Sequence, residues 1–329
     1  MAATEAHPVP LRTTPGQRAV LAERALRPIE GFWGGAFARL RRHRLALVSA
    51  VFILVVAAAA VVVPFFAPTD YADQNYDVIY QGPSWSHPMG TDQLGRDVFV
   101  RLVFGARISL TVGVVVQVVI LTVGVPIGLL AGYTGGTLDT LLMRLVDVLY
   151  ALPNLLFVIV IMTFLRGTLD SEPGGFWHAV GWLDSRTGGL VGVYIGLGLI
   201  GWLTVSRIVR ANTMSLKKTD YAEAARCLGA GHRRIMFRHL LPNTVAPIVV
   251  ATTLGIPAAI LSEAGISFLG LGVIPPMPSW GLMISEALPS LRSHPHLLIF
   301  PATALSLMVL AFNFLGDGLR DALDPWMKR

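Results

Sequence analysis

The chain has 329 residues, of which 53% are hydrophobic and 14% are charged, and its mean hydropathy is +0.62. This composition excludes a soluble globular domain with a charged surface and predicts a membrane protein. The one cysteine, Cys227, excludes an internal disulfide framework and has no partner at a metal-binding spacing. The 26 Lys and Arg residues exceed the 20 Asp and Glu residues, and whether this excess indicates nucleic-acid binding depends on where the basic residues fall.

The N-terminal segment has no apolar periodicity. Residues 1–30 mix Ala, Pro, Thr, Arg and Glu, so we expect a disordered tail that cannot bury enough surface to fold. Residues 31–44, GFWGGAFARLRRHR, bring aromatic side chains such as Trp33 and Phe37 near one helical face and end in arginines. This pattern predicts an amphipathic helix at the membrane surface.

Six apolar stretches follow, each near the length of about 20 residues that crosses a hydrocarbon core of about 30 Å. They run approximately from Leu45 to Phe66, Ile108 to Leu130, Leu145 to Leu165, Gly188 to Ser206, Thr244 to Leu261 and Leu297 to Leu315. The first stretch is too long and too far from the N-terminus for a secretion signal, so we interpret it as a retained anchor.

The basic residues indicate the orientation of these spans. If the N-terminus is cytosolic, 20 of the 26 Lys and Arg residues fall in inside segments and 6 in outside segments. The positive-inside rule therefore predicts that both termini are cytosolic, and nucleic-acid binding is not needed to explain the charge. The predicted parts of the chain are a cytosolic tail (1–30), a surface helix (31–44), the first span with an extracellular loop (45–106), a five-helix core (107–318) and a cytosolic C-terminal tail (319–329).

The loop between the fourth and fifth spans, residues 207–243, has the local signals of two short helices. Asp220 and Glu223 have the spacing of a capping box, the alanines that follow favour helix, and Gly229 is placed to end it. A second helix is expected from about His232 to Leu241, with Pro242 leading into the fifth span.

Helices this short are not stable alone in water, so the loop is expected to dock on something. The small alanines would let the groove of another protein approach closely. Four arginines would attract an acidic rim: Arg226, Arg233, Arg234 and Arg238. Alternatively, Glu223 caps a helix at the membrane surface and the arginines contact anionic lipid. Local physics leaves both interpretations open.

The order Glu223-Ala224-Ala225, then Gly229, then Leu241-Pro242 resembles the EAA loop of permeases in bacterial ATP-binding-cassette importers. His239 stands where that family has Ile, which is similar to the RH-x-LPN variant of the peptide and nickel permease group. Further segments resemble the same group over essentially residues 32–326: HPMGTDQLGRDVFVRLVFGARISL, AGYTGG, EAGISFLGLGV and LGDGLRDALDP.

The resemblance implies an all-α polytopic membrane protein with six transmembrane helices and the type I importer permease fold, in the bacterial inner membrane. It implies a homologous permease subunit, two ATPase subunits that bind ATP and Mg²⁺, and an extracellular solute-binding protein as partners. The coupling residues that it implies are Asp220, Glu223, Ala224, Ala225, Gly229, His239, Leu241 and Pro242. The expected substrates are dipeptides or oligopeptides, and nickel or another small solute is the alternative.

This chain is not expected to be an enzyme or to hold a cofactor of its own. It has no G-x-x-x-x-G-K-[ST] phosphate loop, so another chain must bind ATP. A proton-coupled carrier, the rival from another class, usually needs buried ionisable groups near mid-membrane. Most spans carry none, and Asp147 and Glu263 are expected near interfaces. His294 and His296 flank a proline without a third ligand, which favours a loop over a metal site.

Two glycine repeats and one outer loop leave alternatives open. Gly124, Gly128 and Gly132 recur every four residues, as do Gly192 and Gly196, and this spacing favours close helix packing over a role in lining the substrate path. The three charged residues of the outer segment GTDQLGRD are Asp92, Arg96 and Asp97. They could contact a solute-binding protein or form an internally hydrogen-bonded loop.

Overall fold

The computed structural model describes residues 32–67, 69–171 and 175–324. These residues form helices joined by turns and loops, and the only strand-like pairing among them is a bridge between Thr91 and Asp97. The predicted disordered tail, residues 1–30, lies outside the described residues, as does the end of the predicted C-terminal tail, residues 325–329.

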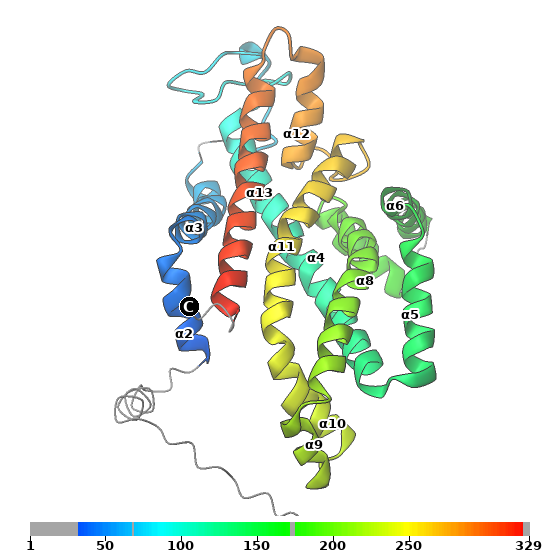
Figure 1. Ribbon diagram of the computed structural model, residues 1–329. Coiled ribbons are helices and arrows are strands. Elements are labelled where there is room, and N and C mark those ends of the chain that lie inside the picture. The colour runs from blue at the N-terminus through cyan, green and yellow to red at the C-terminus, as the bar shows by residue number, and fades with distance from the viewer. Residues whose placement is uncertain (1–31, 68, 172–174, 325–329) are drawn as a thin grey trace, which may run out of the picture.

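Five helical segments are long and apolar enough to cross a membrane, and a bent helix pair makes a sixth if it counts as one span. The five are α3 (Arg44–Phe66), α4 (Val98–Thr134), α8 (Leu190–Leu216), the segment His232–Phe268 that contains α11 (Leu241–Phe268), and α13 (His296–Leu323). The all-helical polytopic prediction is therefore confirmed. The bundle has two distinct ends (Figure 1): the short helices α9 and α10 lie at one, and α12 and the loop before α4 lie at the other. We call these the α9 end and the α12 end.

The third predicted span, from Leu145 to Leu165, is not one continuous helix. The chain instead forms α5 (Gly136–Tyr150) and α6 (Asn154–Ser171), and the two axes meet at 89°. The break falls at Pro153, because a proline disfavours helical backbone at the residue before it and offers no N–H to the preceding turn.

Several helices extend beyond their predicted bounds. α4 begins at Val98, well before Ile108, and its 37 residues measure about 55 Å, so it projects beyond a hydrocarbon core of about 30 Å. α13 continues to Leu323, past the predicted start of the tail. Two helices were not predicted, namely α7 (Phe176–Arg186) and α12 (Trp280–Ala287).

The glycine repeats hold the centre of the bundle together. A methyl group added at Gly128 of α4 would lie 2.4 Å from the backbone oxygen of Ser206 in α8, and one at Gly132 would lie 2.7 Å from that of Arg210. Gly196 of α8 similarly faces Val158 of α6. The close-packing interpretation is confirmed for four of the five glycines, and their contacts are within this chain. Gly192 is the exception, because a methyl group there would come no nearer than 4.0 Å to another atom.

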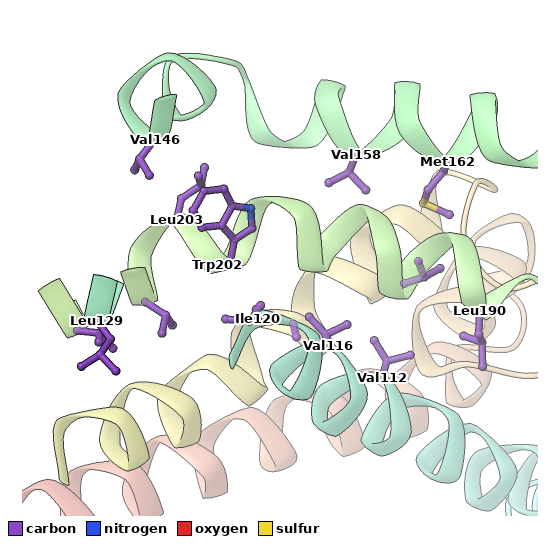
Figure 2. Close-up of a cluster of buried hydrophobic side chains, with 14 of the residues drawn as sticks. Val112, Val116, Ile120, Leu129, Val146, Val158, Met162, Leu190, Trp202 and Leu203 are labelled. Carbon is purple, nitrogen blue, oxygen red and sulfur yellow. The ribbon is translucent and has the colours of Figure 1, made fainter. Parts of the chain in front are cut away.

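A buried apolar cluster fills the space between α4, α6 and α8. Figure 2 shows Val158 and Met162 of α6 pointing toward α8, while Val112 and Val116 of α4 approach α8 from the other side. All four side chains are buried. The bent third span is thus attached to the rest of the bundle through α8.

The N-terminal helices lie at the edge of the bundle. α2 (Phe32–Arg42) is held to the end of α13 by Arg39, whose Nε donates to the backbone oxygen of Ala322 over 2.8 Å. α3 is the most apolar span, yet only 17% of an 18-residue apolar stretch within it is buried in the protein. Its exposed apolar side chains, such as Leu54 and Phe65, are suited to lipid. A membrane-surface position for α2 stays a prediction.

Candidate functional site

The predicted docking helix forms at the tip of the α9 end (Figure 1). α9 (Asp220–Cys227) starts after Thr219, which is its N-cap residue, and it has no side-chain capping hydrogen bond. The predicted capping box of Asp220 and Glu223 is therefore wrong, because Asp220 is already the first residue of the helix and cannot be its N-cap. Asp220 and Glu223 lie in the first turn, where the helix dipole favours negative charge.

Gly229 ends α9, as predicted. Its φ of +76° lies in the left-handed region that favours glycine. The Ala230 N–H donates to the Ala225 oxygen over 3.0 Å, and the Gly229 N–H donates to the Arg226 oxygen over 2.9 Å. This pair of bonds is the Schellman motif, which reverses the chain tightly after the helix.

The predicted second short helix is not a separate element. α10 (His232–Arg234) continues through a turn of π-helix (Ile235–Leu240) into α11, so His232–Phe268 is one helical segment of 37 residues. Pro242 lies in the first turn of α11. A proline has no N–H for an α-helical bond, and a π turn directly before it lets the helix pass without ending.

One face of α9 is anchored in the protein core. Ala222 is fully buried and Ala225 is 8% exposed, and α9 packs on the π turn that holds Ile235 and Leu240. Small alanine side chains let these two elements approach closely. α9 is thereby attached to the base of α11.

Polar contacts attach the same loop to α4. The Lys217 Nζ donates to the backbone oxygen of Gly132 over 2.8 Å, and the Tyr133 hydroxyl lies 2.7 Å from His232 Nδ1. Sequence reasoning did not select Tyr133 or His232, which are about a hundred positions apart. The AGYTGG segment was noted only as a family resemblance.

Two ion pairs join α8 to α5 near this end. Arg210 binds Asp139 through two parallel hydrogen bonds of 2.5 and 2.7 Å. Arg207 Nη2 lies 2.7 Å from Asp147 Oδ1, and its guanidinium also stacks over the Tyr150 ring at 4.5 Å. A bidentate arginine pair fixes orientation as well as distance, so α5 follows the position of α8.

The other face of α9 is open. Glu223 and Ala224 are exposed, as are the four loop arginines. Leu228, at the turn, is 88% exposed and Phe237 is 56% exposed. Of the remaining predicted coupling residues, Asp220, Gly229 and Pro242 are exposed, whereas His239 and Leu241 are half-buried. Some of the predicted coupling residues are therefore exposed and accessible to a partner, whereas the others are buried or half-buried and pack within the protein.

The outer charged residues are used within the chain. Asp92 and Arg96 are 5% and 3% exposed, and Asp92 Oδ2 accepts from Arg96 Nε over 2.7 Å. Arg101 and Glu286 complete this buried cluster, with Arg101 Nη1 2.8 Å from Glu286 Oε2. Asp97 caps α4 by accepting from the Val100 N–H. The geometry favours the internally hydrogen-bonded loop, and it leaves these three residues little surface for a binding protein.

Two further residues can now be placed. Glu263, expected near an interface, lies close to the end of α11, is fully buried, and accepts a hydrogen bond of 2.6 Å from Ser267. His294 stacks on Tyr80, with ring centroids 4.5 Å apart and planes at 9°. Within the described ranges, no group of three or more His, Cys, Asp or Glu residues is arranged to hold a metal ion.

A cavity of about 750 Å³ lies between α4, α5, α6, α8 and α11. Its wall is mostly apolar and glycine-rich, and the described residues that line it include no charged side chain. The polar lining residues are Gln117, Tyr150, Asn154, Thr204 and Ser262. Two of its walls, α8 and α11, are the helices that flank α9 in the chain.

Comparison with known proteins agrees with this architecture. Residues 124–329 match the family described as the binding-protein-dependent transport system inner membrane component. Residues 31–83 match the N-terminal transmembrane domain of oligopeptide transport permease C. A chain of the inward-facing MetNI methionine ABC transporter superposes with a TM-score of 0.53 at 18% identity, covering 69% of this chain and 96% of that one. This last likeness supports the fold alone.

Curated relatives match over nearly the whole length. The chain is 39% identical over 308 residues to the oligopeptide transport system permease protein OppC of Bacillus subtilis, covering 94% of each. It is 40% identical over 309 residues to the dipeptide transport system permease protein DppC of the same organism, covering 94% of this chain and 90% of that one. It is 39% identical over 311 residues to the glutathione transport system permease protein GsiD of Pectobacterium atrosepticum, covering 94% and 95%. The chain therefore belongs to the family of inner membrane permease components of binding-protein-dependent transport systems.

Proposed function

We propose that this chain is the permease subunit of an ATP-driven importer of dipeptides or oligopeptides, and that α9 is the helix on which an ATPase subunit docks. The membrane component of such a system is not itself an ATPase. The relatives are permeases for oligopeptides, dipeptides and glutathione, all of which contain amide-linked amino acids. Peptides are thus the substrate class that these relatives have in common.

The proposed assembly contains a homologous permease, two ATPase subunits that bind ATP and Mg²⁺, and an extracellular binding protein. The α9 end would face the cytosol, and so would both termini. This orientation is supported by the loop arginines, which are exposed around α9, because cytosolic segments of membrane proteins are rich in Lys and Arg.

The observation that carries the proposal is the two-sided character of α9. Ala222 and Ala225 fasten it to the base of α11, while Glu223, Ala224 and Leu228 are exposed. A leucine that is 88% exposed, at the C-terminal end of a helix whose first turn carries two carboxylates, suits burial in the groove of another protein. This favours docking on a protein over a role as a lipid-facing surface helix.

The coupling mechanism follows from what α9 is attached to. ATP binding and hydrolysis on the partner subunits would move α9, and α9 would carry the movement to α8 and α11. Because both helices line the cavity, their displacement would switch it between outward and inward access. The Arg210–Asp139 pair would make α5, a further wall, move with α8.

Two alternatives remain for the substrate and for the energy source. A nickel permease would be expected to offer metal ligands along its path, but the described lining residues have no carboxylate, imidazole or thiol group. A proton-coupled carrier would transport without any ATPase partner. Measurement of ATP dependence separates this second alternative from the proposal.

The experiment is charge reversal at Glu223 in the complete transporter, reconstituted in lipid vesicles. Glu223→Lys places a positive charge in the first turn of α9, where the helix dipole disfavours it, and it repels any partner selected for a carboxylate. We expect loss of ATP-dependent peptide uptake and of ATPase co-purification, with normal membrane insertion. Asp317→Lys is the matched control, because Asp317 is also an exposed carboxylate on a helix, in α13.

The outcomes are distinct. Loss of uptake and ATPase recovery in the Glu223 variant alone supports the docking role of α9. Normal ATP-dependent uptake by Glu223→Lys would refute that role, and peptide uptake by the wild-type chain without any ATPase would favour the carrier.

A further inference from the structure

Among the described residues that line the cavity, one is both polar and buried. Gln117 of α4 is 5% exposed and lines the cavity. Among the described residues, no hydrogen bond satisfies its side-chain amide. The amide nitrogen and oxygen are not among the fully buried polar atoms that lack a partner, so they keep accessible surface at the cavity wall. Their hydrogen-bonding capacity is therefore available to a molecule inside the cavity.

The amide has space only because of the residue opposite. A methyl group added at Gly255 of α11 would lie 2.6 Å from Gln117 Nε2 and 2.7 Å from Oε1. The amide therefore lies against bare backbone of α11, at the point where α4 and α11 both line the cavity. Its position is set by the close approach of these two helices.

The surroundings of Gln117 determine what it can recognise. The other polar lining residues are also neutral, and the remaining wall is largely aliphatic or glycine. The cavity thus offers hydrogen bonds without charge, in a volume of about 750 Å³, which falls within the range of about 300–1,000 Å³ of small-ligand sites. A primary amide both donates and accepts, so it can pair with a second amide through one N–H and one C=O.

We infer that Gln117 contacts the substrate, and that its side-chain amide pairs with a backbone peptide group of the peptide as it passes through the cavity. This inference rests on the proposed peptide-import function and specifies the group that the path recognises. Peptide groups are common to all peptides, whatever their side chains. Such a contact therefore selects for peptide backbone and tolerates varied sequence.

The test combines a substitution in the chain with a substitution in the substrate. The complete transporter is reconstituted in vesicles, and ATP-dependent uptake is measured for dialanine and trialanine and for their counterparts with every peptide nitrogen methylated. Methylation removes the backbone N–H that would donate to Gln117. Gln117→Leu removes the amide and keeps a similar side-chain volume. Gln117→Asn keeps the amide but shortens the side chain by one methylene group.

We expect Gln117→Leu to lower uptake of the unmethylated peptides about fivefold, which corresponds to one net hydrogen bond. Gln117→Leu should also lower the ratio of unmethylated to methylated peptide uptake by a similar factor. Gln117→Asn should lower both quantities to a smaller extent. The same binding protein is used in every assay. Any preference of its own for unmethylated peptide therefore cancels when the uptake ratios of wild type and variant are compared. Thr122→Val, an exposed hydroxyl on α4 outside the cavity lining, should leave the preference unchanged.

The possible failures are distinguishable. An unchanged preference in both Gln117 variants, with wild-type amounts of assembled complex and wild-type ATPase activity, would overturn the inference and leave the proposed function standing. Failure of the wild-type transporter to import these or longer unmethylated peptides would instead overturn the peptide-import function, and the role of Gln117 with it.

Discussion

Replacement of Gly128 by alanine tests how closely α4 and α8 depend on each other. The added methyl group would lie 2.4 Å from the Ser206 oxygen and 2.8 Å from the Val209 Cβ, whereas ordinary contacts begin near 3.4 Å. The two helices would have to separate by about 1 Å, because the nearest atom belongs to backbone. Overpacking of this kind costs about 1–3 kcal/mol. The same substitution also gains about 1 kcal/mol of helix propensity.

Gly265→Ala provides the matched control for this propensity gain. Gly265 is also inside a helix, α11, but a methyl group there would meet nothing within 4 Å. The difference in thermal unfolding midpoint between the two variants, measured on the purified complex in detergent, isolates the steric term. We expect Gly128→Ala to be the less stable by several degrees, and equal midpoints would refute the close-packing argument.

Two further predictions concern the ends of the bundle. Arg101→Leu removes a buried guanidinium between Asp92 and Glu286, so the folded outer loop should lose about 3–5 kcal/mol of stability. The loop should then be cleaved by limited proteolysis between residues 69 and 97. Resistance to cleavage equal to that of the wild type would contradict this prediction. Leu228→Ser should leave the thermal midpoint unchanged, since the side chain is 88% exposed, but should weaken ATPase binding about thirtyfold, the equivalent of about 2 kcal/mol of lost apolar burial. Unchanged affinity in a titration of the purified ATPase would exclude Leu228 from the docking surface.

The sequence was sufficient to predict features that depend on local signals. The apolar runs predicted the spans, because a segment such as Leu45–Phe66 can satisfy its backbone in lipid only as a helix. Gly229 predicted the end of α9, because a left-handed residue is required there. The four-residue glycine spacing predicted close packing, although it could not name α8 as the neighbour.

Features that depend on distant residues could not be predicted in this way. The buried cluster joins Arg96 to Glu286 across 190 positions, and no local pattern links them. The contact between Tyr133 and His232 also joins distant residues and has no local pattern that predicts it. The break at Pro153 did have a local signal in the sequence, namely a proline in the middle of an apolar run. The predicted range of the third span did not take this proline into account.

The continuity of His232–Phe268 has a mechanical consequence. A helix of 37 residues is a rod of about 55 Å, so a tilt of about 5° about one end displaces the other by about 5 Å. Its length hardly changes when it tilts, because hydrogen bonds close most of its turns. Bending is easiest at Pro247 and Pro257, where a bond of the ladder is missing. A displacement of the α9 end therefore changes the tilt of α11 where it lines the cavity. The bending is concentrated at these two prolines.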